Sequence, residues 1–167
     1  MLRADMLTLY YQQTVEIWDS FCRLHQELFE KTCDEYQLLL KGELEQLQDL
    51  IQHKDSLIAQ IAETEKLRQN TIHSLNEKLP SSEKIMNVIQ LLDLLQKEEE
   101  RLTMPALSNL NALLIDIIKA IQEQNKKNQI FLNKAMISLK GLKDSFAGKS
   151  SPALYGRDGQ TTKYLTR

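Results

Sequence analysis

The chain has 167 residues, of which 42% are hydrophobic, 26% charged and 6% aromatic, and its length is typical of one domain with or without a tail. Four of its five glycines fall in the last 27 residues, which excludes β-sandwiches, barrels and doubly wound folds, because those folds need turn-forming residues throughout. The 21 basic and 23 acidic residues leave a net charge of −2, which excludes nucleic acid as the main ligand.

The first predicted helix runs from Asp5 to Leu40, because its apolar residues recur at three- and four-residue steps. Gly42 follows and favours a tight hairpin, although a single glycine also occurs inside uninterrupted helices at a cost of about 1 kcal/mol. Cys22 and Cys33 lie about 16 Å apart along one helix, too far for a disulfide. They are interpreted as small buried side chains in a reducing compartment.

The second predicted helix extends from Glu43 to Lys78 and carries one heptad-like stripe. Pro80 ends this helix, and Ser81 or Ser82 is expected to cap a third helix that runs to Arg101. That helix ends in a charged run, 97–101, which is interpreted as solvated. The stripe of the second helix comprises Leu44, Leu47, Ile51, Lys54, Ile58, Ile61, Glu65, Arg68, Ile72, Leu75 and Leu79.

The last predicted helix begins near Pro105 and continues to Phe146. The pattern as a whole predicts an all-α fold, an elongated antiparallel bundle or coiled coil of three long helices plus one shorter helix. The predicted organisation is a helical domain over residues 1–146 and a flexible tail over 147–167, which is rich in Gly, Ser and Thr.

Five polar residues fall on the predicted helix stripes and allow two interpretations. In the first, the stripes drift in phase and these side chains lie mostly at the surface. In the second, they form a polar layer that fixes the antiparallel register, with Lys54 or Arg68 paired to the asparagines or to Glu65. The five residues are Lys54, Glu65, Arg68, Asn125 and Asn128.

Motifs for catalysis and for metal binding are missing from the sequence. The residues three positions before the histidines are Cys22, Leu50 and Asn70, so the Glu-x-x-His pairs of a di-iron bundle are lacking. There is no Gly-x-Ser-x-Gly elbow and no His-Glu-x-x-His pair. We therefore expect no enzyme activity, no cofactor and no metal. The longest apolar run is interrupted by Asp116 and the N-terminus lacks a signal pattern, so a cytoplasmic location is expected.

The end of the last helix carries more apolar residues than one buried stripe requires. An exposed surplus of this kind fits a surface that grips another helix, and Met and Phe side chains adapt well to such a partner. The alternative is that a neighbouring subunit or the tail covers it. The surplus comprises Ile130, Phe131, Leu132, Met136, Ile137, Leu139, Leu142 and Phe146.

Three segments resemble the FlgN family of flagellar export chaperones. Residues 41–54 are similar to its Lys-Gly turn followed by leucines at three-residue steps, and a stripe leads from there to Arg68. Residues 125–132 are similar to the last helix of that family, and residues 154–159 resemble the Tyr-x-x-x-Gly element of its tail. The resemblance covers nearly the whole chain in layout.

This resemblance implies a cytoplasmic chaperone that binds the C-terminal segments of the hook-filament junction proteins FlgK and FlgL. It further implies delivery of these proteins, kept unpolymerised, to the export gate protein FlhA, with Tyr155 as the gate contact. The alternative is a structural coiled-coil or scaffold protein that self-associates through its exposed apolar helix face, so a homo-oligomer stays open. The residues assigned to the bound protein are Phe131, Leu132, Met136, Leu139, Leu142 and Phe146.

Overall fold

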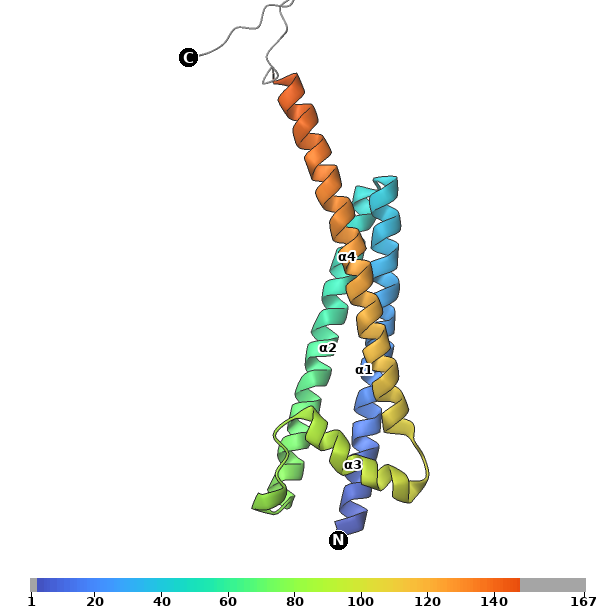
Figure 1. Ribbon diagram of the computed structural model, residues 1–167, viewed down its shortest axis with the longest axis vertical. Coiled ribbons are helices and arrows are strands. Elements are labelled where there is room, and N and C mark those ends of the chain that lie inside the picture. Colours follow the sequence, from blue (N-terminus) through green and yellow to red (C-terminus); the bar gives the residue numbers. More distant parts are fainter. Residues whose placement is uncertain (1–2, 148–167) are drawn as a thin grey trace, which may run out of the picture. The chain divides into compact units, whose positions relative to one another are not determined.

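The computed structural model describes residues 3–147, and these residues form four α-helices and one short 3-10 turn (Figure 1). No strand occurs among them, so the prediction of an all-α fold with three long helices and one shorter helix is confirmed. None of the helices within this part of the chain combines the length and the apolar composition that a membrane span requires. The elements are α1 (Arg3–Lys41), α2 (Leu44–Lys78), η1 (Ser81–Glu83), α3 (Val88–Leu102) and α4 (Ala106–Phe146).

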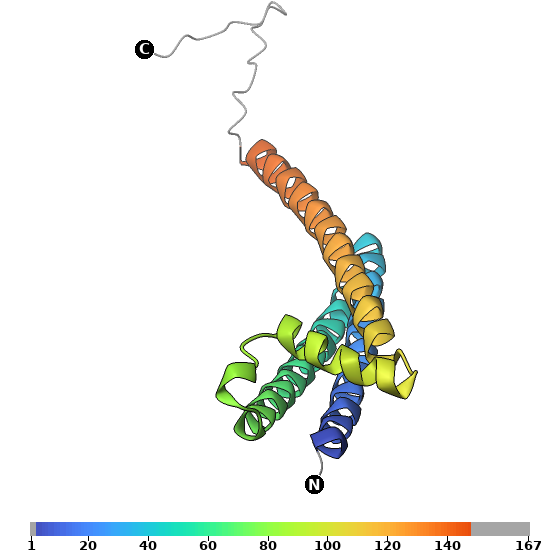
Figure 2. The ribbon, with the colours of Figure 1, turned by 60° about the horizontal axis from the view of Figure 1, so that its bottom comes forward.

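The chain divides into two units, Met1–Asn128 and Gln129–Arg167. In the first unit α1 and α2 lie side by side and run in opposite directions, and α3 crosses them near the start of α1 (Figures 1 and 2). Up to Asn128, α4 runs in the same direction as α1. The second unit contains the remainder of α4, and the predicted tail beyond residue 147 lies outside the described residues.

The core of the first unit forms where all four helices meet around the aromatic residues of α1. Trp18 is 2% exposed, and its ring meets that of Phe21 edge to face with 6.0 Å between the ring centroids. Leu75 of α2 and Leu95 of α3 are fully buried in the same cluster. Each such leucine stabilises the fold by roughly 1.5–3 kcal/mol relative to an exposed one.

The turn between α1 and α2 forms at Gly42, so the predicted hairpin is confirmed. Gly42 has a φ of 72°, in the left-handed region where a Cβ atom causes strain. Its N–H donates to the Leu39 carbonyl oxygen at 3.4 Å, and the Glu43 N–H donates to that of Leu38 at 3.2 Å. This pair of hydrogen bonds closes the helix as a Schellman motif.

Gly42→Ala is expected to lower the free energy of unfolding by about 1 kcal/mol, because alanine must adopt the left-handed conformation there. A Cβ atom added at either Gly42 or Gly141 would meet no other atom within 4 Å, so crowding plays no part. Gly141→Ala is the matched control, since Gly141 lies inside α4 and alanine favours a helix. Urea denaturation followed by circular dichroism should show destabilisation at Gly42 only, and equal effects at both positions would contradict the assignment.

The start of α3 differs from the prediction. Ser81 lies in η1, and α3 is capped by Asn87, whose Oδ1 accepts a hydrogen bond from the Gln90 N–H at 2.9 Å. The chain between them is held by Asn76 of α2, which both donates to and accepts from the backbone of Ile85 at 2.8 Å. Hydrogen bonds between α2 and the connecting segment leave no local sequence pattern, so the prediction that Ser81 or Ser82 caps α3 was wrong.

The end of α3 repeats the Schellman geometry with an unfavourable residue. Thr103 has φ 54° and ψ 32°, and the Met104 N–H donates to the Glu99 carbonyl oxygen at 3.3 Å. A β-branched residue is strained in this conformation. Thr103→Gly should therefore raise the free energy of unfolding by about 1 kcal/mol. Thermal denaturation with Ser82→Gly as a control for a general glycine effect would test this, and an unchanged or lower melting temperature for Thr103→Gly would contradict it.

The predicted stripe of α2 is buried only in part. Leu44, Ile51 and Ile58 are 74%, 44% and 52% exposed, whereas Leu57 is 1% exposed. The residues at seven-residue spacing that begin with Leu50 and Leu57 continue with Thr64 and Thr71, and all four are buried or partly buried. The rest of the predicted stripe is covered, because Ile61 and Ile72 pack against the core and Leu75 and Leu79 are buried.

The charged run 97–101 is not solvated throughout, which corrects the prediction. Glu98 and Glu99 are each 5% exposed, whereas Glu100 is exposed. The Glu98 carboxylate accepts hydrogen bonds from Thr8 Oγ1 at 2.5 Å and from Arg101 Nε at 3.0 Å. Hydrogen bonds and an adjacent cation thus compensate the burial of this charge.

Glu99 connects three elements of the first unit. Its Oε1 accepts from the Ser108 N–H at 3.0 Å and from the Tyr11 hydroxyl at 3.2 Å, and its Oε2 accepts from Ser108 Oγ. Burial raises the pKa of this carboxyl, but the hydrogen bonds from Ser108 and Tyr11 outweigh that effect, so the pKa is lowered. The buried carboxylate caps the first turn of α4, where the helix dipole also favours a negative charge.

Candidate protein-binding surface

Four large apolar side chains near the end of α4 lie on one helix face and are exposed. Met136 is 66% exposed, Leu139 65%, Leu142 56% and Phe146 88%. Their spacing of three, three and four residues places them on one side of the helix. We call these four residues the α4 terminal stripe.

The α4 terminal stripe continues a face that α4 buries earlier in its course. Ile117, Ile121 and Asn128 are 7%, 8% and 3% exposed, and steps of three and four residues lead from them through Leu132 to Leu139. This face of the helix is apolar before and after Asn128, and its residues in the first unit are buried. An apolar face that remains exposed on a helix marks an interaction surface.

All six residues predicted for protein binding share this face of α4, but they differ in exposure. Phe131 and Leu132 are partly buried, whereas the four members of the α4 terminal stripe are open to solvent. The opposite side of the helix carries Ile130 and Ile137, which are 46% and 72% exposed. Two isoleucines seven residues apart form a narrower apolar strip than the four residues of the α4 terminal stripe.

The charge around the α4 terminal stripe is basic. Lys134, Lys140 and Lys143 lie in this part of α4, with Asp144 as its one acidic residue between 129 and 146. A partner with acidic residues beside an apolar stripe would complement this surface in both polarity and charge.

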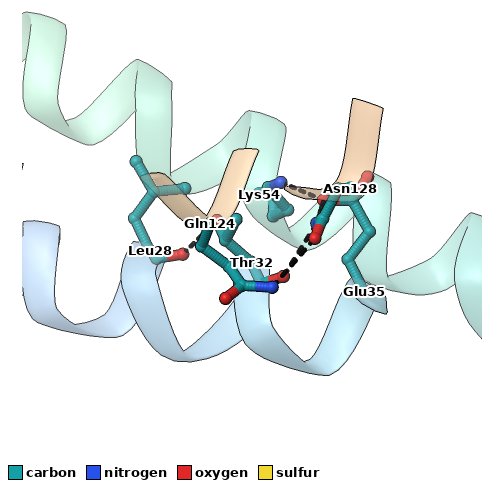
Figure 3. Close-up of polar contacts among 6 residues, drawn as sticks. All are labelled: Leu28, Thr32, Glu35, Lys54, Gln124 and Asn128. Atoms are coloured by element: carbon teal, nitrogen blue, oxygen red, sulfur yellow. Dashed lines mark hydrogen bonds and ion pairs between the residues drawn. The ribbon is translucent and has the colours of Figure 1, made fainter. Parts of the chain in front are cut away.

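A polar layer lies in the first unit where α1, α2 and α4 meet, and Figure 3 shows its members. Lys54 Nζ donates to Glu35 Oε2 at 2.5 Å, and these side chains are only 15% and 17% exposed. Asn128 Nδ2 donates to the same carboxylate oxygen at 3.1 Å and to the Thr32 carbonyl oxygen at 3.0 Å. The layer comprises Thr32, Glu35, Lys54, Gln124 and Asn128, and Gln124 Nε2 donates to Asn128 Oδ1 at 3.0 Å.

Of the five polar residues on the predicted helix stripes, some lie in a polar layer and others lie at the surface or pair within their own helix. Lys54 and Asn128 belong to the polar layer, whereas Asn125 is exposed. Arg68 pairs with Glu65 on its own helix, where Nε donates to Oε2 at 2.7 Å. The hydrogen bonds from Arg68 and Gln69 outweigh burial and lower the pKa of the Glu65 carboxyl.

Glu35 was not predicted to belong to the polar layer, although its carboxylate accepts hydrogen bonds from both Lys54 and Asn128. It follows Thr32 by three residues, and Thr32 lies on the buried face of α1. Residues three apart lie on the same face of a helix, so the position of Glu35 relative to Thr32 could have predicted its partial burial. The layer sits at the end of the first unit, because Asn128 is the last residue of that unit.

The cysteines are free thiols, and burial raises the pKa of both. A raised pKa disfavours the thiolate that nucleophilic catalysis and metal binding require. No cluster of three or more potential metal ligands occurs among residues 3–147. Tyr155, the predicted gate contact, lies outside the described residues.

In the comparison with known proteins, one family model matches nearly the whole chain. The model of the family described as "FlgN protein" matches residues 6–163. No curated protein and no solved structure matches the chain. The family match includes all four helices and extends beyond them over most of the predicted tail. The predicted resemblance is therefore confirmed, and the chain belongs to the FlgN family of flagellar export chaperones.

Proposed function

We propose that this protein is a cytoplasmic chaperone for hook-filament junction proteins of the FlgK and FlgL type. It binds their C-terminal segments, prevents their premature assembly and delivers them to the export gate. The observation that carries the proposal is the α4 terminal stripe, a continuous apolar face that the described residues leave exposed in a FlgN-family protein.

The spacing of the α4 terminal stripe suits a helical or helix-forming partner segment. Its residues lie within eleven positions of α4, about 15 Å along the helix axis, or nearly three helical turns. An amphipathic segment that lies along this face would cover apolar side chains that otherwise contact water. The flexible thioether of Met136 adapts to partners of different shape, as a chaperone for two related junction proteins requires. Phe131 and Leu132 extend the same face toward the first unit.

Tyr155 is proposed as the contact with a gate protein of the FlhA type. The matched control is Tyr164, a second tyrosine in the same segment. Tyr155→Ala should weaken binding to the gate protein while binding of the junction segment stays unchanged, and Tyr164→Ala should leave both interactions intact. Equal loss of gate binding in the two variants would remove the specific role of Tyr155.

Light scattering of the purified protein with and without a FlgK or FlgL C-terminal peptide tests the proposal. The chaperone function predicts that the peptide converts the protein into a complex whose mass is the sum of chaperone and peptide. The competing function is a scaffold that self-associates through the exposed face of α4, which the same apolar surface also favours. A stable homo-oligomer whose mass ignores the peptide would contradict the chaperone function and support the scaffold.

A further inference from the structure

A cavity of about 460 Å³ lies in the first unit where α1 begins and α2 ends. These two helix ends lie at the same end of the α1–α2 pair (Figures 1 and 2). The volume falls in the range of about 300–1,000 Å³ that is usual for ligand pockets. We call this cavity the α1–α2 pocket, and the described residues that line it are Arg3, Met6, Lys78, Leu79 and Pro80.

Three of the lining residues are apolar. Leu79 is 6% exposed, and Met6 packs against the core cluster that contains it. Pro80 follows directly and has no backbone N–H to donate. The side chains of these three residues offer a ligand no hydrogen bond, so this part of the α1–α2 pocket favours an apolar group.

The first of the two cations in the lining is Lys78. Its Nζ lies 5.0 Å from the centroid of the Tyr10 ring, which is a cation–π contact. No carboxylate within residues 3–147 pairs with Lys78, and the adjacent Glu77 pairs with His73 at 3.4 Å instead. The Lys78 ammonium can therefore donate hydrogen bonds to an anionic ligand.

The second cation is Arg3, whose Nη2 donates to Glu83 of η1. A guanidinium carries five N–H donors, so Arg3 can bind a second carboxylate beside Glu83. Asp5 follows Arg3 by two residues and hence lies on a different side of α1. Arg3, Lys78 and Glu83 together leave one positive charge at the α1–α2 pocket, and a single carboxylate would neutralise it.

We propose that the α1–α2 pocket binds the C-terminal residue of a polypeptide that ends in a large apolar side chain. In such a residue the carboxylate and the side chain branch from one Cα atom. The carboxylate can accept hydrogen bonds from Arg3 and Lys78, while the apolar side chain covers Met6 and Leu79. A fatty acid shares the carboxylate, but its long hydrocarbon chain needs a longer apolar surface than these residues supply. This site does not rest on the function proposed for the α4 terminal stripe.

Titration of short peptides into the isotope-labelled full chain, followed by nuclear magnetic resonance, tests the proposal. Acetyl-Gly-Ser-Gly-Leu with a free carboxylate should bind saturably and shift the backbone amide signals of Met6 and Lys78. The same peptide with a C-terminal amide should bind at least roughly tenfold more weakly, because it lacks the charge that the two cations recognise. Acetyl-Gly-Ser-Gly-Gly with a free carboxylate should also bind at least roughly tenfold more weakly, because it lacks the apolar side chain.

Lys78→Gln should weaken binding of the free-acid leucine peptide at least roughly tenfold. Lys66→Gln is the matched control and should bind like the parent, because it removes the same charge from an exposed position of α2 outside the α1–α2 pocket. Octanoate should bind more weakly than the leucine peptide, and tighter binding of octanoate would overturn the polypeptide as the occupant.

Three other results would overturn the proposal. The first is absence of binding, or equal affinity for the free-acid and amide peptides. The second is equal binding by Lys78→Gln and the parent. The third is a set of signal changes at Leu139 in place of those at Met6 and Lys78, because the peptide would then lie on the α4 terminal stripe.

Discussion

Glu99→Ala is expected to lower the free energy of unfolding by about 2–3 kcal/mol. The substitution leaves the Ser108 N–H and hydroxyl without their acceptor at the start of α4. Loss of a hydrogen bond to a charged group costs about 1.5–3 kcal/mol, and loss of a helix cap costs roughly 1 kcal/mol. The Tyr11 hydroxyl keeps the Met104 carbonyl oxygen as a partner at 2.9 Å, which limits the total. Chemical denaturation of the variant and the parent measures this difference.

Glu100→Ala is the matched control for this substitution, because Glu100 is the next residue of the same helix and is exposed. Its free energy of unfolding should stay within about 0.5 kcal/mol of the parent value. Similar losses in the two variants would show that the capping network of Glu99 contributes little.

The pH dependence provides a second measurement on Glu99. The pKa of its carboxyl is lowered in the folded state from the ordinary value of 4.5, so the unfolded chain takes up the proton first as the pH falls. The stabilisation is therefore complete above the ordinary pKa and is lost as the pH falls through the lowered one. Glu98 acts in the same direction, because its hydrogen bond with Arg101 lowers its pKa. Glu99→Ala should thus lose less stability than the parent between neutral and acidic pH.

Glu35→Leu is expected to cost about 2 kcal/mol, because it removes the shared acceptor of the polar layer. Lys54, whose side chain is only 15% exposed, would lose its ion pair, and Asn128 would lose one of its two acceptors. Complete burial of an unpaired charge costs about 3–5 kcal/mol, and the partial exposure of this pair reduces that figure. Adding Lys54→Leu to Glu35→Leu should recover most of the loss, because leucines can fill the same volume without an unpaired charge.

Double-mutant cycles compare the coupling energy of Glu35 and Lys54 with that of an exposed ion pair within α2. Glu63 and Lys66 have side chains that are 70% and 66% exposed and a separation of 2.6 Å between Oε1 and Nζ. Their coupling energy should be about 0.5 kcal/mol or less, whereas that of Glu35 and Lys54 should exceed about 1 kcal/mol. Equal coupling energies would contradict the structural importance of the polar layer. An unchanged oligomeric state and melting temperature in Lys54→Leu would exclude its role in fixing the helix register.

The extent of each long helix followed from the sequence because its signals are local. The observed α1 and α2 begin and end within two residues of the predicted limits, because the three- and four-residue periodicity, Gly42 and Pro80 all act on neighbouring residues. The exposed apolar end of α4 was also predictable, since it carries more apolar residues than one buried stripe uses.

Features that depend on distant partners did not follow from the sequence. The burial of Glu98 and Glu99 depends on Thr8 and Tyr11 of α1, which are about 90 residues away. The core-facing set of apolar residues on α2 depends in the same way on how α1 and α4 pack against it. Residue spacing alone cannot distinguish two overlapping seven-residue repeats such as those of Leu57 and Ile58.

Isothermal titration of a FlgK or FlgL C-terminal segment into two double variants tests the central claim most directly. In Leu139→Gln/Leu142→Gln the α4 terminal stripe loses two members, and glutamine preserves the helix. In Ile130→Gln/Ile137→Gln an equal number of exposed aliphatic side chains is lost from the opposite side of α4. Binding should weaken at least roughly tenfold in the first variant and stay within about twofold of the parent in the second. Equal affinity in both variants would contradict the assignment of this face to the bound protein.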